Sequence, residues 1–149
     1  MKVLVPVDGS IHSEEVIKVA IDFARFKGAE IYVLSVAPNI GGMDEHEISP
    51  AYRERTVREL EKRAEEIVRK ACDLMSAEKV LSSCAKSVVT SVSVPDAICD
   101  FAESEHVDLI LMGSRGLDSS HRFKLGSVAT QVVKAAPCSI YLVKTPSTP

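Results

Sequence analysis

A glycine-rich segment in the C-terminal part of the chain has the residue types and spacing of an anion-binding loop. It reads GSRGLDSSHRFKLGSV, so that Gly113 is followed after two residues by Gly116 and after nine more by Gly126 and Ser127. A glycine lets a ligand approach the backbone N–H groups, and a helix start directs unpaired N–H groups and a positive dipole at an anion. Two such donor groups on one polar loop predict a cradle for a polyphosphate.

The same three glycines could instead serve only a turn and a helix cap, but their order between an apolar strand and a helix favours the binding loop. The segment is not a P-loop, because no Gly-Lys-Ser/Thr follows, and a dinucleotide fingerprint would have to follow the first strand. There the chain reads Asp8-Gly9-Ser10. Asp8 could orient a ribose or hold Mg²⁺, or it could simply form a turn.

Short apolar runs alternate with helical patterns along the whole chain. Helices are predicted to begin at Ser13, at Tyr52, at Pro95 and at Gly126, and the strand-like runs are Lys2–Val7, Glu30–Val36, Lys86–Val94, Val107–Met112 and Ser139–Val143. This alternation predicts a parallel sheet with helices on both faces, with the apolar fourth strand at its centre and the fifth at an edge. Ligands of such sheets bind beyond the carboxyl ends of the strands.

Composition and charge narrow the class of protein. A chain of 149 residues, 46% hydrophobic and 26% charged, predicts one globular domain over 1–149, with a mobile loop at 38–50 and a frayed tail at 145–149. The loop follows the second strand, so it could close over a ligand as a lid or simply be a solvated connection. The net charge is -3 and the sequence has no basic stripe, which argues against binding to nucleic acid. The sequence also contains no run of 18 apolar residues, so a membrane-spanning helix is not expected.

The reactive residue types form no recognisable catalytic or metal-binding cluster. The cysteines form no C-x-x-C motif, so neither a zinc site nor a redox-active pair is expected. Free thiols in a cytoplasmic protein are predicted for Cys72, Cys84, Cys99 and Cys138. The histidines have no partner in sequence, and surface positions are expected for His12, His46 and His106, whereas His121 lies in the glycine loop with Arg122 and Lys124. Without a nucleophile and its base, an enzyme is not expected beyond a slow ATPase.

The sequence resembles the universal stress protein family over essentially its whole length. The resemblance rests on the G-x2-G-x9-G-S spacing and on Val3–Ser10 (VLVPVDGS), Asp108–Gly116 (DLILMGSRG) and Ala136–Val143 (APCSIYLV). It implies a Rossmann-like fold of the adenine nucleotide alpha hydrolase type, with an open five-stranded parallel sheet, and a dimer. Family members that keep the glycine motif bind ATP, so the resemblance implies the ATP-binding branch.

The resemblance also implies a set of nucleotide-binding residues. It places Asp8 near the adenine or ribose and Val36 at the adenine. Mg²⁺ at Asp8, held through the nucleotide, remains an interpretation of that residue alone. The full set for ATP, ADP or AMP is Pro6, Val7, Asp8, Val36, Met112, Gly113, Ser114, Arg115, Gly116, Gly126, Ser127, Val128 and Ala129. The Gly-x-Pro that the family often has before the third helix is replaced here by Ser93-Val94-Pro95.

Three functions remain open. The first is a regulatory ATP-binding module of the stress response. The second is a slow nucleotide hydrolase or nucleotidyl-transfer enzyme, although the H-x-G-H and S-G-G-x-D-S signatures of adenylyl transfer are absent. The third is a nucleotide-free dimeric scaffold. In each case the apolar run Ser139–Val143 is expected to form the homodimer contact, because an exposed edge strand pairs readily with another chain.

Overall fold

The computed structural model describes residues 1–38, 49–80, 84–91, 93–115 and 125–144. Its sheet has the strand order β3-β2-β1-β4-β5, and every neighbouring pair is parallel. The strands are β1 (Lys2–Pro6), β2 (Glu30–Pro38), β3 (Cys84–Ser91), β4 (Leu109–Gly113) and β5 (Ser139–Val143). The helices are α1 (His12–Lys27), α2 (Pro50–Ala77), α3 (Val94–Ser104) and α4 (Ser127–Ala135). The parallel α/β class predicted from the sequence is therefore confirmed.

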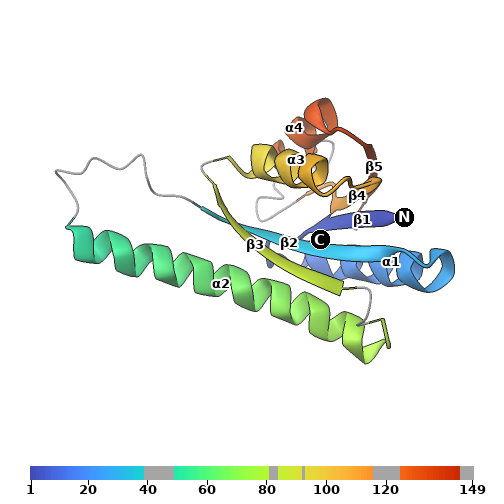
Figure 1. The fold of residues 1–149 in the computed structure, drawn as a ribbon, viewed down its shortest axis with the longest axis horizontal. Coiled ribbons are helices and arrows are strands. Elements are labelled where there is room, and N and C mark those ends of the chain that lie inside the picture. The colour runs from blue at the N-terminus through green and yellow to red at the C-terminus, as the bar shows by residue number, and fades with distance from the viewer. Residues whose placement is uncertain (39–48, 81–83, 92, 116–124, 145–149) are drawn as a thin grey trace, which may run out of the picture.

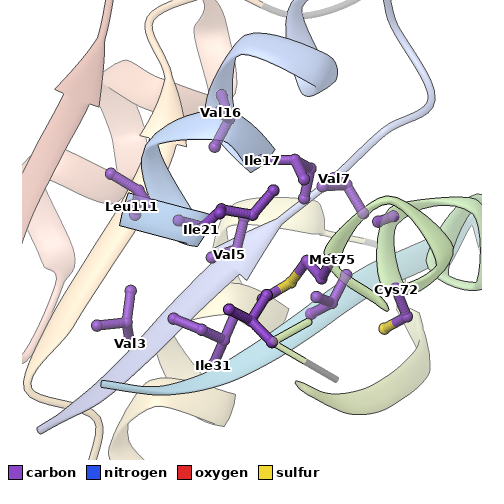
Figure 2. Packing of buried hydrophobic residues seen from close by; sticks show 14 of the residues in the cluster. Val3, Val5, Val7, Val16, Ile17, Ile21, Ile31, Cys72, Met75 and Leu111 are labelled. Carbon is purple, nitrogen blue, oxygen red and sulfur yellow. The ribbon is translucent and has the colours of Figure 1, made fainter. Parts of the chain in front are cut away.

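The helices cover the two faces of the sheet in pairs (Figure 1). Helices α1 and α2 pack on one face, where the buried side chains include Val5 of β1, Ile17 of α1 and Met75 of α2 (Figure 2). Helices α3 and α4 pack on the other face, around Leu4 of β1 and Ile98 of α3. Burial on both faces explains why the central strands read as nearly continuous apolar runs rather than as alternating patterns.

The position of the central strand differs from the prediction. The fourth strand was expected at the centre because of its apolar composition, but β1 occupies that place and β4 lies second from the edge. Lys2–Pro6 contains a lysine and is less apolar than Leu109–Gly113, but the three middle residues of both strands are buried. Composition therefore could not decide between them. The edge position predicted for Ser139–Val143 is confirmed.

Local capping sets the helix bounds more closely than hydrophobic spacing did. Helix α1 begins at His12 rather than at Ser13, and its N-cap Ile11 supplies no side-chain hydrogen bond. Helix α2 begins at Pro50, because Ser49 accepts a hydrogen bond from the backbone N–H of Tyr52. Proline is favoured in the first helical turn, where its missing N–H has no intrahelical partner. Of the predicted mobile loop 38–50, Pro38 belongs to β2, Ser49 caps α2 and Pro50 begins that helix. Residues 39–48 and the tail at 145–149 lie outside the described residues.

The cysteines correct one prediction. Cys72 is disulfide-bonded, so the expectation that it is a free thiol is wrong. Cys99 and Cys138 are free, as expected, and both are half-buried beside the core under α3 and α4. Spacing along the sequence gave no signal for the bond at Cys72, because the pairing of distant cysteines is set by the fold.

Among the described helices, none combines the length and the apolar character that crossing a membrane requires.

Candidate nucleotide site

A cavity of about 440 Å³ lies at the carboxyl ends of β1, β2 and β4. Its floor includes Pro6 and Val7 of the β1 end, Val36 of β2 and Met112 of β4. From β1 the sheet continues to β2 on one side and to β4 on the other. The cavity therefore lies where the strand order reverses, which is where open parallel sheets bind their ligands.

The N-terminus of α4 forms one wall of this cavity. Ser127, Val128 and Ala129, the first residues of the helix, all line it. Their N–H groups precede the first intrahelical hydrogen bond, and the N-cap Gly126 has no side chain to accept from them. Helices α2 and α3 differ, because serine hydroxyls cap their N-termini. The donors and the positive dipole end of α4 are thus available to an anion in the cavity.

Ser114 fixes the place of this helix start. Its backbone N–H donates to the Val143 carbonyl at 3.0 Å, and its own carbonyl accepts from the Gly126 N–H at 2.7 Å. The Gly126 N–H is therefore already bonded, and the donors left for a ligand begin at Ser127. Ser114 itself is buried and lies outside the cavity lining. These two hydrogen bonds give Ser114 a positioning role, and the phosphate contact that the resemblance implies for it stays a prediction.

Gly113 at the end of β4 is required by the turn that follows it. A Cβ at this position would lie 3.0 Å from the backbone oxygen of Arg115 and 3.5 Å from Cγ2 of Val16. We had expected the missing side chain to make room for a ligand. The structure shows that the backbone of the turn occupies much of that room. Gly116, the second glycine of the motif, lies outside the described residues.

Asp8 lines the cavity with its carboxylate held in place. Its Oδ1 accepts hydrogen bonds from the backbone N–H of Ser10 at 2.9 Å and from Oγ of Ser13 at 3.2 Å. Both donors come from the connection into α1, so Asp8 stabilises this turn as well as facing the cavity. In the described parts of the chain no group of three or more His, Cys, Asp or Glu residues could hold a metal ion. Among the described residues that line the cavity, Asp8 supplies the carboxylate oxygen that could contact Mg²⁺.

Most of the residues predicted from the sequence meet in this one cavity. Ser114 lies outside it, and Gly116 is not described. The predicted residues that line it are Pro6, Val7, Asp8, Val36, Met112, Gly113, Arg115, Gly126, Ser127, Val128 and Ala129.

Several other residues line the cavity that the sequence did not predict there. His12 was expected at the surface, but it is only 6% exposed and lines the cavity. Arg63 and Leu60 of α2 also line it, as do Val94 and Ile98 of α3. Nothing local to the sequence of α2 indicates that Leu60 and Arg63 reach the ends of the strands.

Comparison with known proteins places the chain in a family. Residues 1–144 match the model of the Universal stress protein family. The universal stress protein MJ0531 of Methanocaldococcus jannaschii is 34% identical over 151 residues, which cover 97% of this chain and 82% of the relative. A universal stress protein of Methanothermobacter thermautotrophicus is 32% identical over 145 residues, covering 97% of this chain and 95% of the relative.

Solved structures show the same fold. Universal stress protein UspA from Lactobacillus plantarum superposes with a TM-score of 0.81 at 22% identity, covering 96% of this chain and 97% of that one. The Archaeoglobus fulgidus universal stress protein in complex with dAMP has a TM-score of 0.67 at 24% identity, covering 97% and 98%. A universal stress protein in complex with cAMP has a TM-score of 0.70 at 21% identity, covering 96% of each chain.

Proposed function

Because the chain belongs to the universal stress protein family, we propose that it binds ATP in the cavity at the ends of β1 and β4 and acts as a regulatory module of the stress response. The observation that carries the proposal is the uncapped N-terminus of α4 in the wall of that cavity. Three adjacent backbone donors at a positive dipole end match the oxygens of a phosphoryl group. In this proposal the chain acts as one universal stress protein domain.

The rest of the cavity suits the remainder of a nucleotide. Val7, Val36 and Ile98 provide apolar surface for a base, and a volume of about 440 Å³ falls within the range of small-molecule sites. The structures of family members with dAMP and with cAMP support a nucleotide ligand. Oγ of Ser10, a lining residue, is buried without a hydrogen-bond partner, which is the state expected of a group whose partner is a ligand.

Magnesium would accompany the nucleotide rather than bind on its own. Asp8 would supply one oxygen, and the ion would take the others from phosphoryl groups and water, as Mg²⁺ commonly does. The bound ion would neutralise part of the phosphate charge. Asp8 Oδ1 already accepts two hydrogen bonds and its Oδ2 would bind the ion, so no carboxylate oxygen of the described lining is left to activate a water molecule. This favours binding over rapid hydrolysis.

A homodimer through β5 is the second part of the proposal. β5 pairs with β4 alone in the described sheet, so its other edge is open to a second chain. Tyr141 of β5 is 46% exposed and stacks edge-to-face with Phe23 of α1, with 5.8 Å between ring centroids. An aromatic side chain held in this way offers apolar area to a partner at little entropic cost. Pairing two β5 strands about a two-fold axis would cover both edges.

Mass spectrometry of denatured, freshly purified protein tests the nucleotide, and calorimetry with added ATP tests the site. We expect co-purified ATP or ADP and a dissociation constant in the micromolar range, about -8 kcal/mol. A constant ratio of ATP to ADP over hours would support a binding module, whereas steady conversion would support a hydrolase. A protein that carries no nucleotide and binds none in calorimetry would be the scaffold that we do not favour.

A further inference from the structure

Two polar side chains on the α1 side of the cavity, the hydroxyl group of the half-buried Ser10 and the imidazole of His12, have no hydrogen-bond partner among the described residues. Oγ of Ser10 is buried and unpaired. The residue His12 is 6% exposed, and no described residue forms a hydrogen bond or an ion pair with its ring. Both residues line the cavity. Because buried polar groups in folded proteins are nearly always hydrogen-bonded, we infer that a ligand supplies the missing partner.

Arg63 adds a positive charge from α2. Glu59 lies four residues earlier, a spacing that allows an ion pair on one helix face. At the same spacing, Arg58 and Glu54 do form an ion pair, with 2.6 Å between Nη2 and Oε1. In the described part of the chain, Arg63 makes no such contact with any acidic residue, and it lines the cavity instead. Its guanidinium group is thus available to a ligand.

The charges that line the cavity favour an anion in this second place. Asp8 carries the negative charge of the described lining, and its Oδ1 is engaged by Ser10 and Ser13. Arg63 and Arg115 carry positive charge. A guanidinium, an imidazole and a hydroxyl group can all donate hydrogen bonds, and an Arg-containing donor set of this kind is typical of sites for phosphoryl oxygens.

We propose that Ser10, His12 and Arg63 form a second phosphoryl subsite, separate from the N-terminus of α4. The subsite lies toward α1 and α2, whereas α4 packs on the opposite face of the sheet. The inference rests on the proposed nucleotide site and deepens it. The cavity then selects ligands with more than one phosphoryl group and prefers ATP to AMP. The second group comes from the same nucleotide or from inorganic phosphate bound beside AMP.

Calorimetry with ATP and with AMP on Arg63→Gln tests the subsite. Arg63 is an exposed residue of a long helix, so its substitution leaves the core intact. We expect the affinity for ATP to fall about tenfold or more, because one charge-assisted hydrogen bond is lost. The affinity for AMP should change by less than about twofold. Arg58→Gln on the same helix removes an equal charge away from the cavity and should alter neither affinity.

A further arm identifies the source of the second phosphoryl group. If inorganic phosphate tightens AMP binding by the wild type but not by Arg63→Gln, the subsite takes a separate phosphate. If inorganic phosphate does not tighten AMP binding, and ATP affinity still falls in Arg63→Gln, the second phosphoryl group belongs to the nucleotide. Equal losses for ATP and AMP in Arg63→Gln, or no loss for either, would overturn the subsite and leave the nucleotide site standing. A wild-type protein that binds no nucleotide would overturn both.

Discussion

Gly126 donates its backbone N–H to the carbonyl oxygen of Ser114 at 2.7 Å, which joins the start of α4 directly to the end of β4. The glycine loop lies between these two residues in sequence. The hydrogen bond therefore fixes the orientation of the helix N-terminus against the sheet. The backbone N–H of Ser114 donates in turn to the Val143 carbonyl of β5, so one buried residue links the end of β4 to both α4 and β5.

Replacing Gly126 should weaken nucleotide binding without unfolding the protein. Gly126 has φ -58° and ψ 156°, a conformation open to any residue, so Gly126→Val should keep the backbone unstrained. A branched side chain beside the first N–H groups of α4 would obstruct a phosphoryl group. We expect ATP affinity in calorimetry to fall at least about tenfold, the effect of losing one charge-assisted hydrogen bond.

Gly28→Ala is the matched control for that experiment. Gly28 ends α1 in the left-handed region at φ 62°, remote from the cavity lining, with open space where a Cβ would lie. The substitution should cost about 1 kcal/mol of unfolding free energy, because an L-residue is strained there. ATP affinity should stay at the wild-type value. Unchanged affinity in Gly126→Val would remove α4 from the proposed site.

Gly113→Ala should destabilise the fold itself. The new Cβ would lie 3.0 Å from the Arg115 carbonyl oxygen, which belongs to the backbone and cannot rotate away as a side chain could. We expect a loss of about 1–3 kcal/mol in urea unfolding, typical of a forced close contact. A variant as stable as the wild type would show that the turn after β4 adjusts without cost.

The dimer proposal predicts that Tyr141→Asp is a monomer. A carboxylate on the open edge of β5 would face its own copy across a two-fold axis, and like charges there repel. Sedimentation at tens of micromolar, roughly the scale of ordinary association constants, should show a wild-type dimer and a variant monomer. Tyr52→Asp, at another exposed tyrosine, on α2, should remain dimeric. A monomeric wild type would rule the interface out.

The two free thiols should make stability fall at alkaline pH. Burial raises the pKa of the Cys99 thiol, and the negative charge of Asp96 raises it further. Burial also raises the pKa of the Cys138 thiol, although a hydrogen bond from the backbone of Ile110 has a smaller opposite effect. The folded state thus holds these protons more tightly than the unfolded state. The resulting stability is complete below the ordinary thiol pKa and is lost as the pH rises through the raised values.

Urea unfolding without reductant, measured from about pH 7 to pH 10, tests this effect. The wild type should lose unfolding free energy more steeply over that range than the Cys99→Ala/Cys138→Ala variant. Tyrosines and lysines titrate in both proteins and cancel in the comparison. Parallel pH profiles would contradict the assignment.

Local sequence patterns predicted the parallel α/β class and most of the cavity lining. The residues near a strand end or a helix start indicate where it lies, as the apolar run that ends at Val7 and the Gly126-Ser127 pair show. A parallel sheet then brings the carboxyl ends of its strands together at one edge, where the cavity lies. The place of β1 at the centre was not predictable, because it depends on pairing with β4 far along the chain. His12 and Arg63 were missed for the same reason, since their positions depend on how α1 and α2 pack.

The place of β1 at the centre of the sheet has a consequence for the order of folding. Its pairing with β2 uses residues close in sequence, but its other neighbour begins only at Leu109, which aligns with Val3. During synthesis the first strand therefore has one unpaired side until most of the chain has been made. Contacts of such long sequence separation slow folding, because the intervening chain must be ordered first. We expect the β1–β4 pairing to complete late, after the β1–α1–β2 unit has collapsed.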